Sequence, residues 1–172
     1  MPKKNKTTRL IVAASEHDPD MLYATKFWAP DPFIFLEQNG KRTLVLSDLE
    51  IDRARKQAKA DEFVSFSKLE GEVQGKSKKP PQYEKVLAHF LRKRGVRSTV
   101  VPANFPLGYA QELAANRIRL RTTNGLFWPQ REAKSDKELN LMERAIRITE
   151  AGLRRAMEVL KASKPGPRKP PP

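Results

Sequence analysis

The stretch of sequence that decides the fold is residues 32–46, PFIFLEQNGKRTLVL. It contains two β-rich runs, residues 32–37 and 42–46, separated by Gln-Asn-Gly-Lys. Asn-Gly between two such runs is a strong signal for a tight turn, so the stretch predicts an antiparallel hairpin. Phe33 and Phe35 alternate along the first run, and we expect their rings to lie in the core.

Strand and helix patterns alternate on both sides of this hairpin. Residues 10–14 form a continuous apolar run, typical of a strand that is covered on both faces. After the hairpin the patterns predict helices at residues 50–60, 82–94 and 106–115, and strands at residues 62–67, 98–102 and 116–121. Strands separated by helices imply a mostly parallel sheet, and the hairpin makes that sheet mixed. The predicted fold class is therefore α/β, with a mixed, mostly parallel sheet flanked by helices.

Two segments of this body have weaker patterns. Residues 20–27 predict one or two helical turns. Residues 70–81 are rich in glycine, lysine and proline, and we expect them to form an exposed loop.

A long helix is predicted at residues 134–161. Ser135 and Glu138 have the spacing of a capping box, which specifies where the helix begins. Its apolar residues cover more than a narrow stripe of its circumference, so the helix needs covering on more than one side. We expect it to be the first element of a second domain that this chain lacks.

The composition places limits on the class of protein. With 172 residues, of which 38% are hydrophobic and 31% charged, the chain can bury one ordinary core. It has no cysteine, which excludes disulfides and thiolate metal sites and fits a reducing cytoplasm. The apolar run near the N-terminus is too short for export or for a membrane span. We therefore expect a cytoplasmic protein that does not enter a membrane.

The net charge of +14 invites a nucleic-acid interpretation, but half of it lies at the two ends. Residues 1–9 hold four basic residues and residues 162–172 hold three, and neither segment holds an acid. We expect residues 1–9 to be a basic flexible lead and residues 162–172 to be a disordered tail rich in proline and lysine. A mildly basic body with basic ends is a common solvated surface, so nucleic acid is not the favoured partner.

No residue pattern indicates catalysis. His17 and His89 lack neighbours at metal-ligand spacing and are expected to be ordinary surface residues. Asp18 and Asp20 flank a proline, which is more typical of a turn than of an acid–base pair. No glycine-rich phosphate loop is present. We therefore assign no catalytic residue and no metal ligand to this chain.

Two other groups of residues are candidates for contact surfaces. Tyr23, Phe27 and Trp28 stand in a turn-rich segment, where a core role and a contact role are about equally expected. Arginines at positions 117, 119 and 121 could bind phosphates, but a charged edge strand in contact with solvent is the commoner arrangement.

Three motifs, in this order, resemble those of a known family. Residues 23–27, Tyr-Ala-Thr-Lys-Phe, resemble the Tyr-Leu-Thr-Gly-Phe segment that follows the first strand of the creatinase-like N-terminal domain. Residues 32–46 resemble its hairpin, and residues 131–138 resemble its Arg-x-x-Lys-Ser-x-x-Glu junction. Over roughly residues 8–161, the chain thus resembles the aminopeptidase P, prolidase and creatinase family of pita-bread metallopeptidases. Lys26 stands where the family usually has glycine.

The resemblance implies a domain organisation and a function. Residues 10–133 would be a creatinase-like N-terminal domain with a ribonuclease H-like motif, and residues 134–161 would be the first helix of the catalytic domain. In such Xaa-Pro aminopeptidases the catalytic domain holds two divalent metals, manganese, cobalt or zinc, with two aspartates, a histidine and two glutamates. None of these ligands maps onto this sequence, so the chain would be inactive alone.

For this chain, the resemblance implies a non-catalytic role. It would make contacts in a homo-oligomer and would form one wall of a cleft that takes proline-containing peptides, with the missing catalytic domain as its partner. Tyr23 and Phe27 would face that substrate. Two alternatives stay open: a basic nucleic-acid-binding module that uses the arginine strand, and a stand-alone protein that dimerises through the helix at residues 136–161.

Overall fold

A computed structural model describes residues 7–76, 78–164 and 166, and the chain divides into two units, residues 1–129 and 130–172. In the described residues the first unit contains one six-stranded sheet with strand order β4-β3-β2-β1-β5-β6. The strands are β1 (Arg9–Ala13), β2 (Phe33–Gln38), β3 (Lys41–Leu46), β4 (Glu62–Ser65), β5 (Ser98–Val101) and β6 (Arg119–Thr122). The pairs β3–β4, β1–β5 and β5–β6 are parallel, and β1–β2 and β2–β3 are antiparallel. The predicted mixed, mostly parallel sheet is confirmed.

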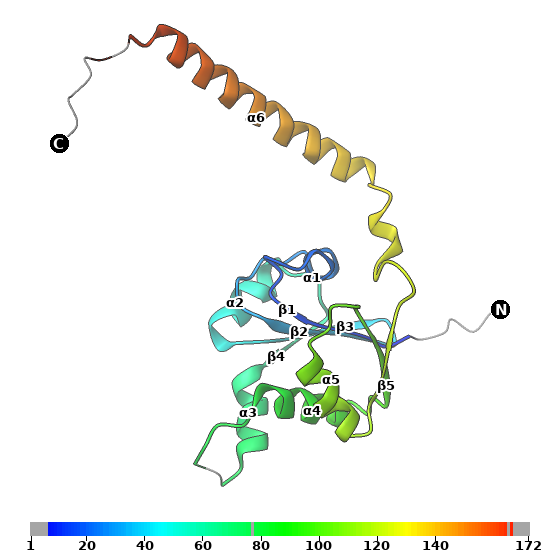
Figure 1. Cartoon of the computed structure of the whole chain (residues 1–172). Coiled ribbons are helices and arrows are strands. Elements are labelled where there is room, and N and C mark those ends of the chain that lie inside the picture. Colours follow the sequence, from blue (N-terminus) through cyan, green and yellow to red (C-terminus); the bar gives the residue numbers. More distant parts are fainter. Residues whose placement is uncertain (1–6, 77, 165, 167–172) are drawn as a thin grey trace. The chain divides into compact units, whose positions relative to one another are not determined.

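Helices cover both faces of this sheet. The helices of the first unit are α1 (Pro19–Thr25), α2 (Asp48–Gln57), α3 (Phe66–Gln74), α4 (Tyr83–Lys93) and α5 (Leu107–Ala115). Figure 1 shows α1 and α2 on one face and α3, α4 and α5 on the other. The second unit contains α6 (Asp136–Ala162), and a short 3-10 turn, η1 (Pro129–Arg131), lies at the division between the units.

The hairpin predicted from residues 32–46 is β2 and β3. Asn39 and Gly40 both have positive φ, 55° and 82°, which is the backbone of the tight hairpin turn that Asn-Gly favours. Phe33 and Phe35 are 2% and 0% exposed, so the prediction that their rings lie in the core is confirmed. The turn places Phe35 opposite Leu44 in the register of the two strands.

The apolar run at residues 10–14 forms β1, which lies between β2 and β5. Leu10 and Val12 belong to the core under α3, α4 and α5, whereas Ile11 belongs to the core under α1 and α2. Successive side chains of a strand point to opposite faces, so a strand between two helical layers must be apolar throughout. Residues 1–6 of the predicted basic lead lie outside the described residues, and Arg9 already begins the strand.

The prediction of a loop over residues 70–81 is wrong for its first part, because α3 continues to Gln74. The Ser65 side chain accepts a hydrogen bond from Lys68 N and caps the start of the helix. Leu69 is 3% exposed, and Val73 packs against the same core. Burial of these side chains offsets the cost of about 1 kcal/mol of placing Gly71 inside a helix.

The predicted capping box at the start of α6 is confirmed. Ser135 Oγ accepts from Glu138 N at 3.4 Å, and Glu138 Oε2 accepts from Ser135 N at 3.1 Å. Apolar side chains of α6 are exposed, including Ile148 at 72% and Leu153 at 62%. In the described part of the chain, no helix combines the length and the apolar character needed to cross a membrane.

Tyr83 in α4 has a buried hydroxyl that finds no hydrogen-bond partner in the described residues. Its ring stacks between Phe66 at 4.7 Å and Tyr109 at 5.5 Å, and burial raises the pKa of this phenol. Tyr83→Phe removes the unsatisfied group and keeps the stacked rings. We therefore expect it to increase the free energy of unfolding by about 1 kcal/mol, measured by denaturant unfolding. Tyr109→Phe, at a less buried hydroxyl, is the matched control, and a destabilised Tyr83→Phe protein would contradict the prediction.

Glu72 joins α3 to α4 through side-chain contacts. Its carboxylate accepts from Lys93 Nζ at 2.7 Å and lies 2.8 Å from His89 Nε2, and these bonds lower its pKa from 4.5 to about 2. Because the folded-state pKa is the lower one, this stabilisation is present above pH 4.5 and is lost as the pH falls toward 2. Glu72→Gln should therefore be less stable than the parent chain near neutral pH, and the difference should shrink in acid. Unfolding curves at several pH values test this, and a difference that does not change with pH would refute it.

Candidate functional site

The candidate site is built on α1, the short helix that follows β1. The carboxylate of Asp18 accepts from Met21 N at 2.8 Å and caps the N-terminus of α1, and Pro19 occupies its first turn. The helix ends at Lys26, whose N–H donates to Leu22 O at 2.8 Å. Lys26 has φ 52° and ψ 25°, the left-handed conformation in which glycine is usually found at a helix end. Glycine would take this conformation with less strain than lysine.

Tyr23 lies on α1 and keeps part of its surface exposed. Its ring packs, tilted by 44°, against Trp128 at 6.3 Å between centroids. Lys26 Nζ lies 4.4 Å from the centroid of the same ring, a cation–π distance. One part of the ring is therefore held by the core, and the half-buried side chain retains surface for a ligand or a partner.

Phe27, the second predicted substrate-facing residue, is 1% exposed. Its ring meets the edge of Phe33 at 6.0 Å, and the guanidinium of Arg53 lies 4.4 Å from its centroid. Its N–H donates to Thr25 Oγ1 at 3.2 Å, which fixes the turn after α1. With so little exposed surface, Phe27 packs in the core beside α1.

Trp28 is the exposed aromatic of this segment, with 52% of its surface open to solvent. Its carbonyl accepts from Arg53 Nη1 at 2.9 Å, so its backbone is held to α2. Leu22 is also 38% exposed. Together Leu22, Tyr23, Lys26 and Trp28, which we call the α1 surface, offer apolar and aromatic contacts and one positive charge.

Trp128 is the residue that the sequence analysis missed. It is 6% exposed, and its indole N–H donates to the carbonyl of Asp20 at 3.1 Å, across 108 residues. Its ring meets Phe35 and Phe127 edge-on at 6.1 and 5.1 Å. It lies in no helix or strand, so no periodic pattern signals its burial. It ties the end of the first unit to α1 and supports Tyr23.

The described residues contain no group of three or more histidine, cysteine, aspartate or glutamate side chains that could hold a metal ion. They therefore do not fit a two-metal centre. His17 is exposed in a turn, and His89 is bonded to Glu72. The carboxylate of Asp18 serves as a helix cap and lies 3.5 Å from Asn104 Nδ2.

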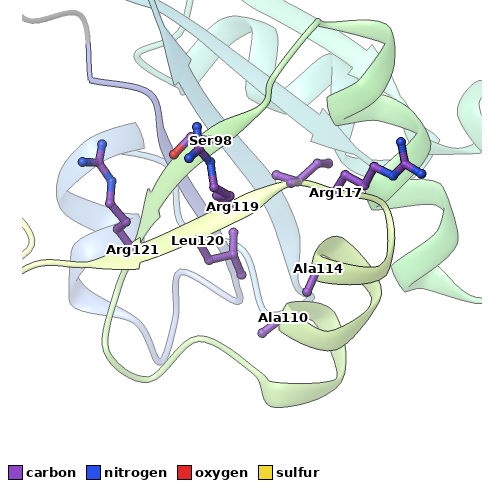
Figure 2. Close-up of a pocket in the computed structure, with 8 residues that line it drawn as sticks. Ser98, Ala110, Ala114, Arg117, Arg119, Leu120 and Arg121 are labelled. Atoms are coloured by element: carbon purple, nitrogen blue, oxygen red, sulfur yellow. The ribbon is translucent and has the colours of Figure 1, made fainter.

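The predicted charged edge strand is β6. It is the last strand of the sheet, and Arg119 and Arg121 are exposed on it. Arg117 does not belong to the strand, because its φ of 60° makes it the turn residue between α5 and β6. Figure 2 shows the three arginines around a pocket beside this strand.

Solved structures with a similar fold are proline-specific peptidases. A prolidase from Pyrococcus horikoshii OT3 matches 98% of this chain with a TM-score of 0.64 and 19% identity. An X-Pro aminopeptidase from Thermotoga maritima MSB8 matches 94% with a TM-score of 0.68 and 15% identity, and a Xaa-Pro dipeptidase from Bacillus anthracis matches 95% with a TM-score of 0.67 and 15% identity. No protein-family model matches the sequence, and no curated protein matches it significantly.

These matches establish the fold that the sequence motifs predicted. The chain spans about two fifths of each of the three structures, 42%, 42% and 41% of their lengths. Its fold is thus that of one part of prolidase and Xaa-Pro aminopeptidase chains. The match extends over both units of this chain, because 98% of 172 residues must include most of α6.

The backbone of Lys26 can be tested by two substitutions that both remove its ammonium group from Tyr23. Lys26→Gly relieves the left-handed strain, whereas Lys26→Ala retains the Cβ that causes it. We expect the glycine variant to be the more stable by about 1 kcal/mol in denaturant unfolding. If the alanine variant proved equally stable, the prediction that the backbone of Lys26 is strained would be refuted.

Proposed function

We propose that this chain is the non-catalytic N-terminal domain of a Xaa-Pro aminopeptidase or prolidase-like metallopeptidase of the pita-bread family. The observation that carries the proposal is the fold match, which covers 94–98% of this chain and about two fifths of each peptidase. The ordered motifs at residues 23–27, 32–46 and 131–138 support it independently.

In this proposal residues 10–133 are the N-terminal domain and residues 134–161 are the first helix of the catalytic domain. The exposed apolar side chains of α6, such as Ile148 and Leu153, support this assignment, since a catalytic domain would cover them. That domain would supply the two aspartates, the histidine and the two glutamates. Its manganese, cobalt or zinc ions would activate the attacking water and polarise the peptide carbonyl.

The role proposed for this chain is to make oligomer contacts and to form one wall of the cleft for proline-containing peptides. The α1 surface is the part of the described chain that suits the second role. Tyr23 and Trp28 offer aromatic faces against which a proline ring can pack, and Phe27 holds the segment in place from the core. We further propose a cytoplasmic location, which the lack of cysteine supports.

A binding and hydrolysis experiment tests this role. The chain supplied with Mn²⁺, Co²⁺ or Zn²⁺ should release no amino acid from Xaa-Pro dipeptides, whereas its amide NMR signals around Tyr23 and Trp28 should shift when the dipeptide is added. Tyr23→Ala should remove most of the shift, because it deletes the exposed aromatic face. Leu49→Ala, at a 93% exposed position on α2, is the control for a surface truncation.

Two results would contradict the proposal. Hydrolysis of the dipeptide by the chain alone would show that the chain is not a non-catalytic domain. Equal NMR shifts with the Xaa-Pro dipeptide and with its reversed Pro-Xaa sequence would show that the surface does not select for proline in the second position.

A further inference from the structure

The outer edge of β6 has free backbone groups. β6 pairs with β5 alone, and in the described residues of the first unit no strand lies on its other side. Arg119 N donates toward β5, to Arg97 O at 3.0 Å. Successive residues of a strand direct their backbone groups to opposite sides, so those of Leu120 and Thr122 face the free edge. Such an edge can accept a further strand.

The two faces of β6 differ in chemistry. Leu120 lies beside Thr99 and packs with the core under α5, while Arg119 and Arg121 lie on the opposite face. Figure 2 shows Leu120 directed toward the side where Ala110 and Ala114 of α5 lie, and the two arginine side chains leaving the strand in the other direction. The groove along this edge has a volume of about 950 Å³. An added strand would therefore meet an apolar surface on one face and positive charge on the other.

Positive charge is concentrated at this edge. The groove beside β6 and a smaller one of about 570 Å³, which shares Arg117 and Arg119 with it, are together lined by Arg92, Arg97, Arg117, Arg119 and Arg121. No aspartate or glutamate lines either groove. All five arginines are exposed, and in the described part of the chain their side chains make no ion pair or hydrogen bond.

The other arginines of the first unit are each paired with a carboxylate. They are Arg9 and Arg42 with Glu37, Arg53 with Glu50, Arg55 with Asp52, and Arg94 with Glu62. The unit therefore neutralises its arginines everywhere except at the β6 edge. Unpaired guanidinium groups at a free strand edge are complementary to an anionic ligand.

We propose that the β6 edge binds an extended acidic peptide as an additional strand, in which acidic residues alternate with small apolar residues. The acidic residues would meet Arg119 and Arg121, and the apolar ones would meet Ala110, Ala114 and Leu120. Backbone hydrogen bonds to Leu120 and Thr122 would supply the pairing. This inference rests on the geometry of the first unit and does not depend on the proposed peptidase relationship.

Two other occupants fit the edge less well. A nucleic acid that binds in such a groove gains much of its affinity from bases stacked on aromatic rings, and no aromatic side chain lines either groove. A second copy of the chain paired through β6 would bring Arg119 and Arg121 of both copies together, and like charges across a strand pair destabilise it.

The test uses the whole chain and two end-blocked peptides of the same composition. One peptide alternates glutamate and valine, and the other has all its glutamates before its valines. We expect the alternating peptide to bind at least about tenfold more tightly by titration calorimetry, a difference of about 1.4 kcal/mol. It should also slow amide hydrogen exchange at Leu120 and Thr122.

Matched charge reversals locate the binding. The double variant Arg119→Glu, Arg121→Glu should weaken binding by about tenfold or more. The control Lys56→Glu, Lys59→Glu makes the same change in net charge at exposed lysines in and just after α2, and it should leave the affinity within about twofold.

Several results would overturn the proposal. Tighter binding of an oligothymidylate than of the alternating peptide, with affinity that falls steeply with salt, would assign the edge to nucleic acid. If, without any peptide, amide hydrogen exchange at Leu120 slowed as the protein concentration rose, the edge would be assigned to a second copy of the chain. Equal binding of the two peptides, or no binding of either, would show that the edge does not accept an acidic strand.

Discussion

The register of the β2–β3 hairpin is the constraint on which the first unit depends. Side chains alternate along a strand, so a shift of β2 by one residue would exchange its two faces. It would move Phe33 and Phe35 from the core under α1 and α2 to the core under α3, α4 and α5. The turn at Asn39 and Gly40, both with positive φ, prevents such a shift. Because β1 pairs with β2, the same turn also determines which residues of β1 face each helical layer.

Much of this fold could be predicted because its signals are local. The Asn-Gly turn, the apolar run of β1 and the capping box at Ser135 and Glu138 each act within a few residues. The helix α3 was not predicted, because the strand pattern of residues 62–67 overlaps its start, and Gly71 with the lysines and prolines that follow it suggests a loop. The helix is stabilised by the burial of Leu69 and the packing of Val73. Both depend on β strands and on α4, which lie outside the local sequence.

The candidate site could be predicted only in part, for the same reason. The motif at residues 23–27 located α1, but the left-handed turn at Lys26 sends Phe27 into the core and leaves Trp28 outside. The support that Trp128 gives to Tyr23 comes from 105 positions further along the chain. The arginines of β6 were visible in the sequence, whereas the absence of carboxylate partners around them, among the residues that the structure describes, depends on the tertiary structure.

The bond between Trp128 and Asp20 has a consequence for how the chain folds during synthesis. The ribosome releases α1 long before residue 128, so α1 and Tyr23 remain without one of their packing partners until almost all of the first unit has been made. The hairpin of β2 and β3 closes over a short loop and can form much earlier. The packing around α1 is therefore completed only after residue 128 has left the ribosome, and a nascent chain that stops earlier lacks the ring contacts that Trp128 makes with Tyr23 and Phe35.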